Sequence, residues 1–219
     1  EERGLYKKMT VWDQLMYLAN LKGLNNKEAK SKINYWINRF DIESWKSKKI
    51  QELSKGMQQK IQFIATVLHE PPLIILDEPF SGLDPVNTNI IRDEIHRLKD
   101  EGASVIFSTH RMESVEEICE DIVLINQGKV QLTGAVDEIK ENHKENMFEF
   151  TFGEIIENTS SLPNVPGVIA VDVNQNKVTI QCDSEESVNT YLKKLIDSNF
   201  TLKAFNEILP SIHEIFIKL

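Results

Sequence analysis

The chain has 219 residues, of which 41% are hydrophobic, and its formal net charge is −9 at pH 7. This hydrophobic content supports a sizeable core, in one large domain or in one medium domain with a smaller one attached. The acidic balance excludes a basic surface that attracts nucleic acid or anionic lipid non-specifically, so we expect no nucleic-acid partner.

The cysteines and the apolar runs indicate the kind of compartment in which the protein works. Cys119 and Cys182 lie far apart without metal-ligand spacing, which indicates reduced cysteines of a cytosolic protein. No apolar run approaches the roughly 18 residues of a membrane span, and no signal peptide is visible. The sequence opens "EERGLYKKMT" without an initiator Met, from which we expect that it begins within a longer protein.

Residues 10 to about 70 are predicted to be helical. The first helix opens at Thr10 with Asp13, and the second at Asn25 with Glu28. A third helix starts at Ser54 and runs to about residue 68, where "HEPP" ends it. The apolar residues of the first two helices recur at helical spacing and are predicted core residues: Val11, Leu15, Leu18, Ile33, Trp36, Ile37 and Phe40.

The pattern changes at Leu73. "LIIL" and "SVIFST" are short apolar runs, each predicted to be a strand buried on both faces. A helix from about Pro85 to Asp100 lies between them, with Gly102 as its stop signal. "MESVEEICE" follows as a helix and "DIVLINQGKVQLTG" as two strands around an Asn-Gln-Gly turn. This alternation predicts a parallel α/β sheet.

From about residue 140 the pattern is that of a small α+β domain, with a ferredoxin-like arrangement as one option. "MFEFTF", "GVIAVDVN", "KVTIQCD" and "FTLKAFNEI" are predicted strands. A helix is predicted from Glu185 to Ser198, and Pro and Ser open a last one in "PSIHEIFIKL". This region carries no obvious chemistry.

The strand "LIILDE" ends in Asp77 and Glu78, at the carboxyl edge where open α/β sheets bind ligands. An aspartate there can hold Mg²⁺ through water, and the adjacent glutamate can polarise an attacking water molecule. The second strand, "FSTH", delivers His110 to the same edge, where an imidazole can hydrogen-bond a terminal phosphate. Each signal alone is also compatible with a purely structural residue.

The stretch "LSKGMQQK" opens the third helix. Ser54 can cap it and Gly56 lets a ligand approach the backbone, so the helix start forms a candidate anion site. An ordinary N-cap is the alternative. The turn "SGLD" after Pro79 is predicted to project Asp84 away from the body of the domain.

Four elements follow one another along the chain: "LSKGMQQK", "LIILDE", "SGLD" and "FSTH". In this order they resemble the ATP-binding-cassette (ABC) ATPases. The resemblance covers about residues 1–135 and implies a signature motif, a Walker B strand, a D-loop and a switch histidine. It predicts an α/β fold: a partial P-loop NTPase domain with a helical signature subdomain, followed by a small C-terminal α+β domain. The predicted domains are residues 1–138, with the helical subdomain at about 10–70 and the catalytic-core part at about 71–138, and residues 139–219.

The resemblance implies roles for individual residues. Ser54 and Gly56 would bind the γ-phosphate of ATP held by a second subunit, and Asp84 would reach across the dimer. Asp77 would support Mg²⁺, Glu78 would be the catalytic base or water-orienting carboxylate, and His110 would contact the γ-phosphate. Glu1, or else Glu2, matches the position of the Q-loop glutamine.

Two departures from the family pattern stand out. The usual Leu-Ser-Gly-Gly-Gln signature is here Leu-Ser-Lys-Gly-Met, so Lys55 adds a cation and Met57 removes a side-chain amide. No G-x-x-x-x-G-K-[ST] occurs among the nine glycines, and the Gly128-Lys129 pair is followed by Val130. We therefore predict that this chain alone binds nucleotide weakly or not at all and is inactive.

The C-terminal region, ending "LPSIHEIFIKL", resembles the accessory domain of bacterial exporter-type subunits, including sodium-efflux and antibiotic-export types. The resemblance implies a homodimer that powers a separate transmembrane permease, contacted through the helical subdomain with Tyr6 and Trp12. It places the protein in the cytoplasm, peripherally on the inner face of the cell membrane.

Two alternatives remain open at this stage. One is a soluble ABC ATPase that acts on ribosomes or nucleic acid, although such proteins usually carry two cassettes or a long coiled-coil insertion. The other is an interaction module without catalysis, for which a missing phosphate-binding loop would be natural.

Overall fold

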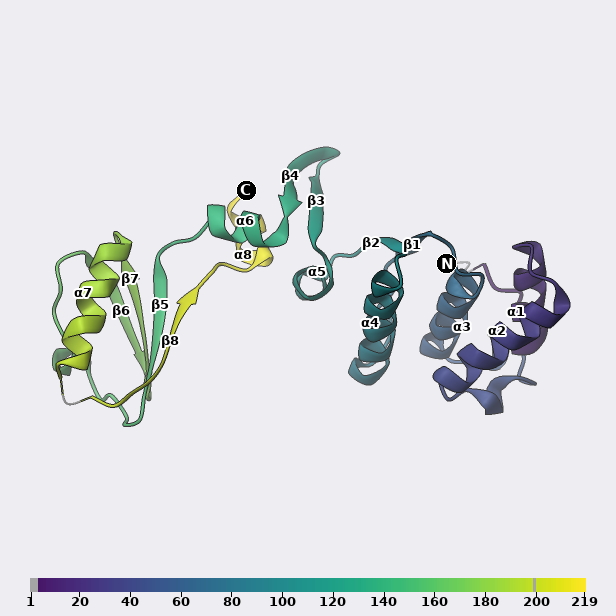
Figure 1. Ribbon diagram of the computed structural model, residues 1–219, viewed down its shortest axis with the longest axis horizontal. Coiled ribbons are helices and arrows are strands. Elements are labelled where there is room, and N and C mark those ends of the chain that lie inside the picture. The colour runs from purple at the N-terminus through teal and green to yellow at the C-terminus, as the bar shows by residue number, and fades with distance from the viewer. Residues whose placement is uncertain (1–3, 199) are drawn as a thin grey trace. The chain divides into compact units, whose positions relative to one another are not determined.

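The structure, a computed structural model, describes residues 4–198 and 200–219. The chain divides into two compact units, Glu1–Arg111 and Met112–Leu219 (Figure 1). The domain boundary predicted after residue 138 falls inside the second unit and stays a prediction.

The helical part of the first unit contains α1 (Val11–Leu21), α2 (Asn26–Arg39) and α3 (Lys55–Val67), with short 3₁₀ turns at Glu43–Trp45 and Ile50–Glu52. The predicted caps are confirmed. Thr10 caps α1, Asn25 forms a capping box with Glu28 on α2, and Ser54 caps α3. Of the predicted core residues all are buried except Leu18, which is half-buried.

The α/β part consists of β1 (Leu73–Asp77), α4 (Pro85–Asp100) and β2 (Ser104–Ser108). The two strands are parallel and in register from Leu73 opposite Ser104 to Asp77 opposite Ser108. Gly102 lies at φ +98°, where a residue without a Cβ is favoured, and ends α4 as predicted. The predicted parallel connection is confirmed, and it brings the carboxyl ends of both strands to one edge.

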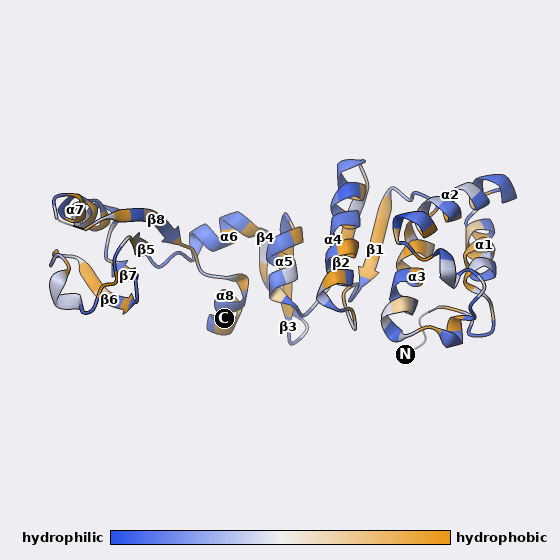
Figure 2. Ribbon diagram, turned by 90° about the horizontal axis from the view of Figure 1, so that it is seen from below, coloured by the Kyte–Doolittle hydropathy of each residue, from blue (hydrophilic) through white to orange (hydrophobic). Residues whose placement is uncertain are grey.

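The prediction that these strands are buried on both faces is wrong. In β1 the side chains alternate, with Ile74 and Leu76 buried but Leu73 and Ile75 49% and 67% exposed. Ile106, opposite Ile75 on β2, is also exposed. The strand is hydrophobic along its length (Figure 2), but α4 packs against one face of this two-stranded sheet, and no described residue buries the other.

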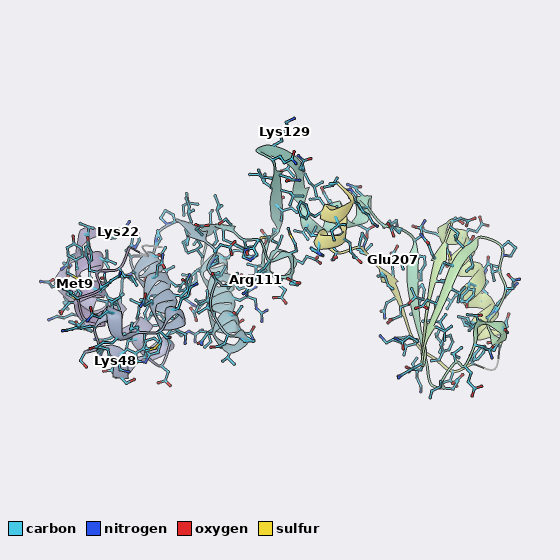
Figure 3. The ribbon with its side chains drawn as sticks, turned by 180° about the vertical axis from the view of Figure 1, so that it is seen from behind. Met9, Lys22, Lys48, Arg111, Lys129 and Glu207 are labelled. Atoms are coloured by element: carbon cyan, nitrogen blue, oxygen red, sulfur yellow. The ribbon has the colours of Figure 1, made fainter. Side chains whose placement is uncertain are left out.

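The second unit begins with α5 (Met112–Ile118), the antiparallel pair β3 (Asp121–Asn126) and β4 (Lys129–Ala135), and α6 (Val136–Asn142). The predicted turn is confirmed: Gln127 and Gly128 lie at φ +51° and +73°, as in a type I′ hairpin. Lys129 lies at the tip of this hairpin (Figure 3). The pair forms a sheet of its own, separate from β1 and β2.

A four-stranded antiparallel sheet forms the rest of the unit. It contains β5 (Met147–Phe152), β6 (Val168–Asn174), β7 (Lys177–Cys182) and β8 (Leu202–Ile208), in the order β6-β7-β5-β8. Helix α7 (Glu185–Ile196) buries Val188, Tyr191 and Leu195 against one face. This order is the ferredoxin-like one, with the 3₁₀ turn Thr159–Ser161 in place of the first helix.

The last helix, α8 (Ile212–Lys218), begins at the capping residue Ser211 as predicted. It packs against α5 and α6. Among the described residues no helix is both long and apolar enough to cross a membrane.

Candidate functional site

The acid pair lies where β1 ends. Asp77 is the last residue of the strand and pairs with Ser108 of β2, whose hydroxyl donates a hydrogen bond to Asp77 Oδ1. The Glu78 amide donates to the Ser108 carbonyl at 3.0 Å. The second strand therefore holds both acidic residues in place, one through a side chain and one through its backbone.

Glu78 is hydrogen-bonded to His110, which the sequence placed at the same edge of the sheet. Its Oε1 accepts a hydrogen bond from the His110 amide at 3.0 Å and lies 2.7 Å from His110 Nδ1. The Thr109 hydroxyl donates to Oε2 at 3.4 Å. Glu78 also lies at φ +46°, a left-handed conformation that costs a non-glycine residue free energy and that clusters at functional sites.

This geometry has a chemical consequence for the histidine. A carboxylate at Nδ1 favours the tautomer that carries its proton there, so Nε2 remains for another partner. The His110 side chain is 79% exposed and that of Glu78 33%. An imidazole nitrogen and a carboxylate are thus both accessible at the carboxyl edge of the sheet, where a ligand phosphate and a water molecule can reach them.

The donor set at Asp77 fits Mg²⁺. The Asp77 carboxylate and the Ser108 hydroxyl are hard oxygen ligands of the kind Mg²⁺ prefers. Among the described residues no three His, Cys, Asp or Glu side chains cluster as a metal site. A protein site of one or two carboxylates, completed by water and substrate phosphate, is the usual way in which Mg²⁺ is bound.

The start of α3 lies against the turn that follows the acid pair. Ser54 Oγ accepts a hydrogen bond from the Met57 amide at 3.3 Å, so the serine is an N-cap, as the sequence allowed. A Cβ added to Gly56 would lie 3.4 Å from the Gly82 carbonyl oxygen, and one added to Gly82 would lie 3.2 Å from Lys55 Cδ. Glycine at both positions permits this close approach.

A buried hydrogen bond supports the same contact. Gln59 Nε2, one turn into α3, donates to the Pro79 carbonyl at 3.3 Å. The segment Ser54–Met57 and the turn after Glu78 are thus neighbours within the first unit, although the sequence separates them by more than twenty residues.

Asp84 is exposed, as predicted, but its carboxylate has a structural task. It caps α4, accepting from the Asn87 amide at 2.9 Å and from Asn87 Nδ2 at 2.5 Å. These hydrogen bonds from Asn87 lower the pKa of Asp84. The expected reach toward a second subunit therefore stays a prediction about a residue that already has partners.

One predicted residue is not described by the structure, and three residues that contact the site were not predicted. Glu1, the predicted Q-loop residue, lies outside the described residues. Sequence reasoning missed Ser108, Thr109 and Gln59. The hydroxyls of "FSTH" could have been found, because a parallel register places that segment beside "LDE"; the contact of Gln59 depends on how α3 packs, for which the sequence carries no local signal.

Comparison with known protein families gives two matches. Residues 134–219 match the family described as "ATP-binding protein DrrA1-3-like, C-terminal domain". Residues 39–116 match one described as "AAA domain, putative AbiEii toxin, Type IV TA system". The first match starts at the end of β4 and the second spans the acid pair and His110.

Individual relatives cover the whole chain. An uncharacterized ABC transporter ATP-binding protein of Alkalihalophilus pseudofirmus is 41% identical over 100% of this chain and 80% of its own length. The uncharacterized ABC transporter ATP-binding protein YhaQ of Bacillus subtilis is 42% identical over 100% of this chain and 72% of its own.

A solved ATP-binding subunit of an ABC transporter is similar in structure, with 33% identity and a TM-score of 0.59 over 63% of this chain and 57% of its own. The acid pair, the histidine beside it and the capped helix after "LSKG" thus occur in a chain whose relatives match it along its full length. The chain belongs to the family of ABC transporter ATP-binding proteins.

Proposed function

We propose that this chain is the catalytic and dimer-facing part of an ATPase subunit that hydrolyses MgATP and powers an ABC transporter, in the direction of export. The observation that carries the proposal is the Glu78–His110 pair beside Asp77, held by β2 at the carboxyl edge of the parallel strands. A strained glutamate with an exposed carboxylate is suited to orient a water molecule for attack on a phosphate.

His110 and Asp77 have complementary tasks in this proposal. In the protonated form of His110, Nδ1–H donates to Glu78 and Nε2–H donates to the terminal phosphate, because a neutral imidazole with its proton on Nδ1 offers only an acceptor at Nε2. Asp77 holds Mg²⁺, which when bound neutralises the charge that develops on the phosphate oxygens. The Ser108 hydroxyl orients the Asp77 carboxylate.

The start of α3 serves the nucleotide of a second subunit. The Ser54 hydroxyl, the Lys55 cation and the backbone at Gly56 form an anion-binding surface at a helix N-terminus. Met57 lies beside them, and its amide donates to Ser54 Oγ. Asp84 contacts the same second subunit from the α4 cap. Glu1, or else Glu2, would take the place of the family's Q-loop glutamine and would offer a carboxylate oxygen to the Mg²⁺ site.

The transmembrane partner docks on the helical part of the first unit. Tyr6 and Tyr17 pack edge to face with ring centroids 5.5 Å apart, and both are exposed, as is Leu21 one turn beyond Tyr17. An exposed aromatic cluster of this kind is typical of a protein interface. With such a partner the protein works in the cytoplasm, peripherally on the inner face of the membrane.

The test is Glu78→Gln in the full-length protein. We expect retained ATP binding, dimers that persist in ATP during gel filtration, and loss of turnover, because the amide cannot act as a base. Glu101→Gln, on the exposed end of α4 in the same unit, is the matched control and should hydrolyse ATP as the wild type does. Unchanged turnover in Glu78→Gln would remove Glu78 from its proposed role.

A second test uses the 219-residue chain alone. It contains no G-x-x-x-x-G-K-[ST] loop, which in P-loop proteins cradles the β- and γ-phosphates. We therefore expect weak or no heat of MgATP binding in titration calorimetry. Stoichiometric binding with micromolar affinity would contradict this part of the proposal.

A further inference from the structure

Glu78 has a backbone conformation that its surroundings must hold in place. It lies at φ +46° and is followed by Pro79, although a residue before proline favours extended backbone. Such a conformation persists only where neighbouring contacts fix it. On the side of β2 these contacts are the hydrogen bonds of Glu78 with Ser108 and His110. The turn that follows Glu78 needs contacts of its own.

Two of these contacts come from the turn itself and from β2. The Ser81 amide donates to the Glu78 carbonyl at 3.0 Å, which closes the turn. The Phe80 side chain is 1% exposed, and its ring packs edge to face on that of Phe107, with centroids 6.0 Å apart. This buried ring anchors the middle of the turn to the second strand of the sheet.

The third contact comes from α3. Gln59 is 9% exposed, and its Nε2 donates to the carbonyl of the buried Pro79 at 3.3 Å. Without this donor a buried carbonyl would lose its hydrogen bond, which is costly. Gln59 lies one turn after Gly56, whose Cα is so close to the turn that an added Cβ would lie 3.4 Å from the Gly82 carbonyl oxygen. Gln59 therefore fixes the turn relative to the start of α3.

We propose, on the basis of the ATPase function above, that Gln59 is a positioning residue for Glu78. By holding the Pro79 carbonyl, it keeps the Glu78 carboxylate directed at His110 and at the water molecule that Glu78 orients. Because Gln59 belongs to the helix whose start is the proposed phosphate-binding segment, it also links the two halves of the proposed site within the first unit. It acts through Glu78 and needs no contact with nucleotide.

The variants that test this role remove the donor and keep the side-chain volume. Gln59→Met leaves the Pro79 carbonyl without a donor, and Gln59→Glu replaces the amide with a carboxylate, which only accepts hydrogen bonds when ionised. Gln58→Met is the matched control. Gln58 Nε2 donates to the carbonyls of Ile50 and Leu53 at 3.2 and 3.0 Å, so this variant loses two side-chain hydrogen bonds of the same helix and none to the turn.

The first readout is the His110 ring in the 219-residue chain. With ¹⁵N-labelled histidine, its Nδ1 resonance is identified by its loss in His110→Ala, and Glu78→Ala gives the shift that follows when the carboxylate is absent. We expect both Gln59 variants to move the resonance in the same direction as Glu78→Ala, and Gln58→Met to leave it in place. Either Gln59 variant suffices if the other does not fold. A resonance that stays in place in the folded Gln59 variants overturns the inference.

The second readout is steady-state hydrolysis by the full-length protein. Gln59→Met should lower kcat about threefold to tenfold, with KM for ATP within about twofold, because Glu78 acts in the hydrolytic step and coupling within one network is of this size. Gln58→Met should keep kcat within about twofold of the wild type. An unchanged kcat in Gln59→Met, or an equal fall in both variants, overturns the positioning role.

The two readouts separate this inference from the proposed function. If the wild type hydrolyses ATP, Glu78→Gln abolishes turnover and Gln59→Met behaves as Gln58→Met does, only the positioning role fails. If the wild type does not hydrolyse ATP, the proposed function fails, and the resonance of His110 still reports whether Gln59 acts on Glu78.

Discussion

Glu94 is the buried carboxylate that joins α2 to α4 in the first unit. Its Oε1 accepts from Arg39 Nε at 2.5 Å, and its Oε2 accepts from Arg97 Nε at 2.8 Å. The Glu94 side chain is 3% exposed, against 48% for Arg39 and 25% for Arg97. Glu94→Gln replaces the carboxylate with a neutral amide, which is a weaker acceptor for the two guanidinium groups. Because the Glu94 side chain is buried, water cannot replace the lost interaction there.

The cost follows from these exposures. Removing one partner of a fully buried ion pair lowers the free energy of unfolding by about 3–5 kcal/mol. Because Arg39 is half-exposed and can return to water, we expect a smaller loss, about 2 kcal/mol. For a unit of this size that corresponds to a fall in the unfolding midpoint of about 10 °C.

Tryptophan fluorescence is the natural assay. All three tryptophans, Trp12, Trp36 and Trp45, lie in the first unit, so urea unfolding followed by their emission reports that unit alone. The control is Glu101→Gln, which removes a surface carboxylate from Arg97 and should cost about 0.5 kcal/mol or less. If both variants unfold at the same urea concentration, the buried carboxylate does not stabilise the unit and the reasoning is refuted.

Two further predictions concern one residue in each unit. Gly82→Ala should cost about 1–2 kcal/mol more than Gly102→Ala in the same fluorescence assay, because both residues have positive φ but only a Cβ at Gly82 meets Lys55. Equal costs would show that the contact with Lys55 is unimportant. Burial raises the pKa of Tyr191 to about 12, so stability present below pH 10 should fall by up to about 3 kcal/mol as pH rises to 12. Its hydroxyl has no partner among the described residues, so Tyr191→Phe should be no less stable at pH 7 and should lose this dependence; circular dichroism of urea unfolding at pH 8 and pH 11 decides.

Helix starts were predictable because capping is local chemistry. Thr10, Asn25, Ser54 and Ser211 each bond a backbone amide two or three residues ahead, so the residue types alone indicate the position. The hairpin after β3 was predictable for the same reason, since Gly128 next to Gln127 is suited to a tight turn.

Burial of the strands was not predictable in this way. An apolar run such as "LIIL" indicates that side chains favour an apolar environment, but not which described elements cover them. In the structure α4 lies on one face of the sheet formed by β1 and β2. The side chains of Ile75 and Ile106 point to the other face and are exposed. A statement about both faces needs the packing of the whole sheet.

The sequence allowed us to predict which residues of the site lie at the same edge of the sheet. Parallel register explains why Glu78 and His110 meet although 32 residues separate them. The details beyond that level are orientations of side chains: which nitrogen of His110 faces the carboxylate, and that Asp84 turns back to cap its own helix. These depend on rotamers and on local hydrogen-bond competition, which a motif does not specify.

The turn after the acid pair is held from two sides by residues that lie outside the sequence motifs. The motifs therefore do not indicate all the contacts that position the site. From one side α3 rests on it through Gly56 and Gln59; from the other, α4 begins at Asp84 and is tied to α2 through Glu94. Arg39 and Glu94 lie 55 residues apart and belong to neither predicted motif. The placement of the start of α3, the proposed phosphate-binding segment, relative to Glu78 therefore depends in part on the ion pair of Glu94 with Arg39 and Arg97. A variant that weakens this ion pair should loosen both halves of the proposed site together.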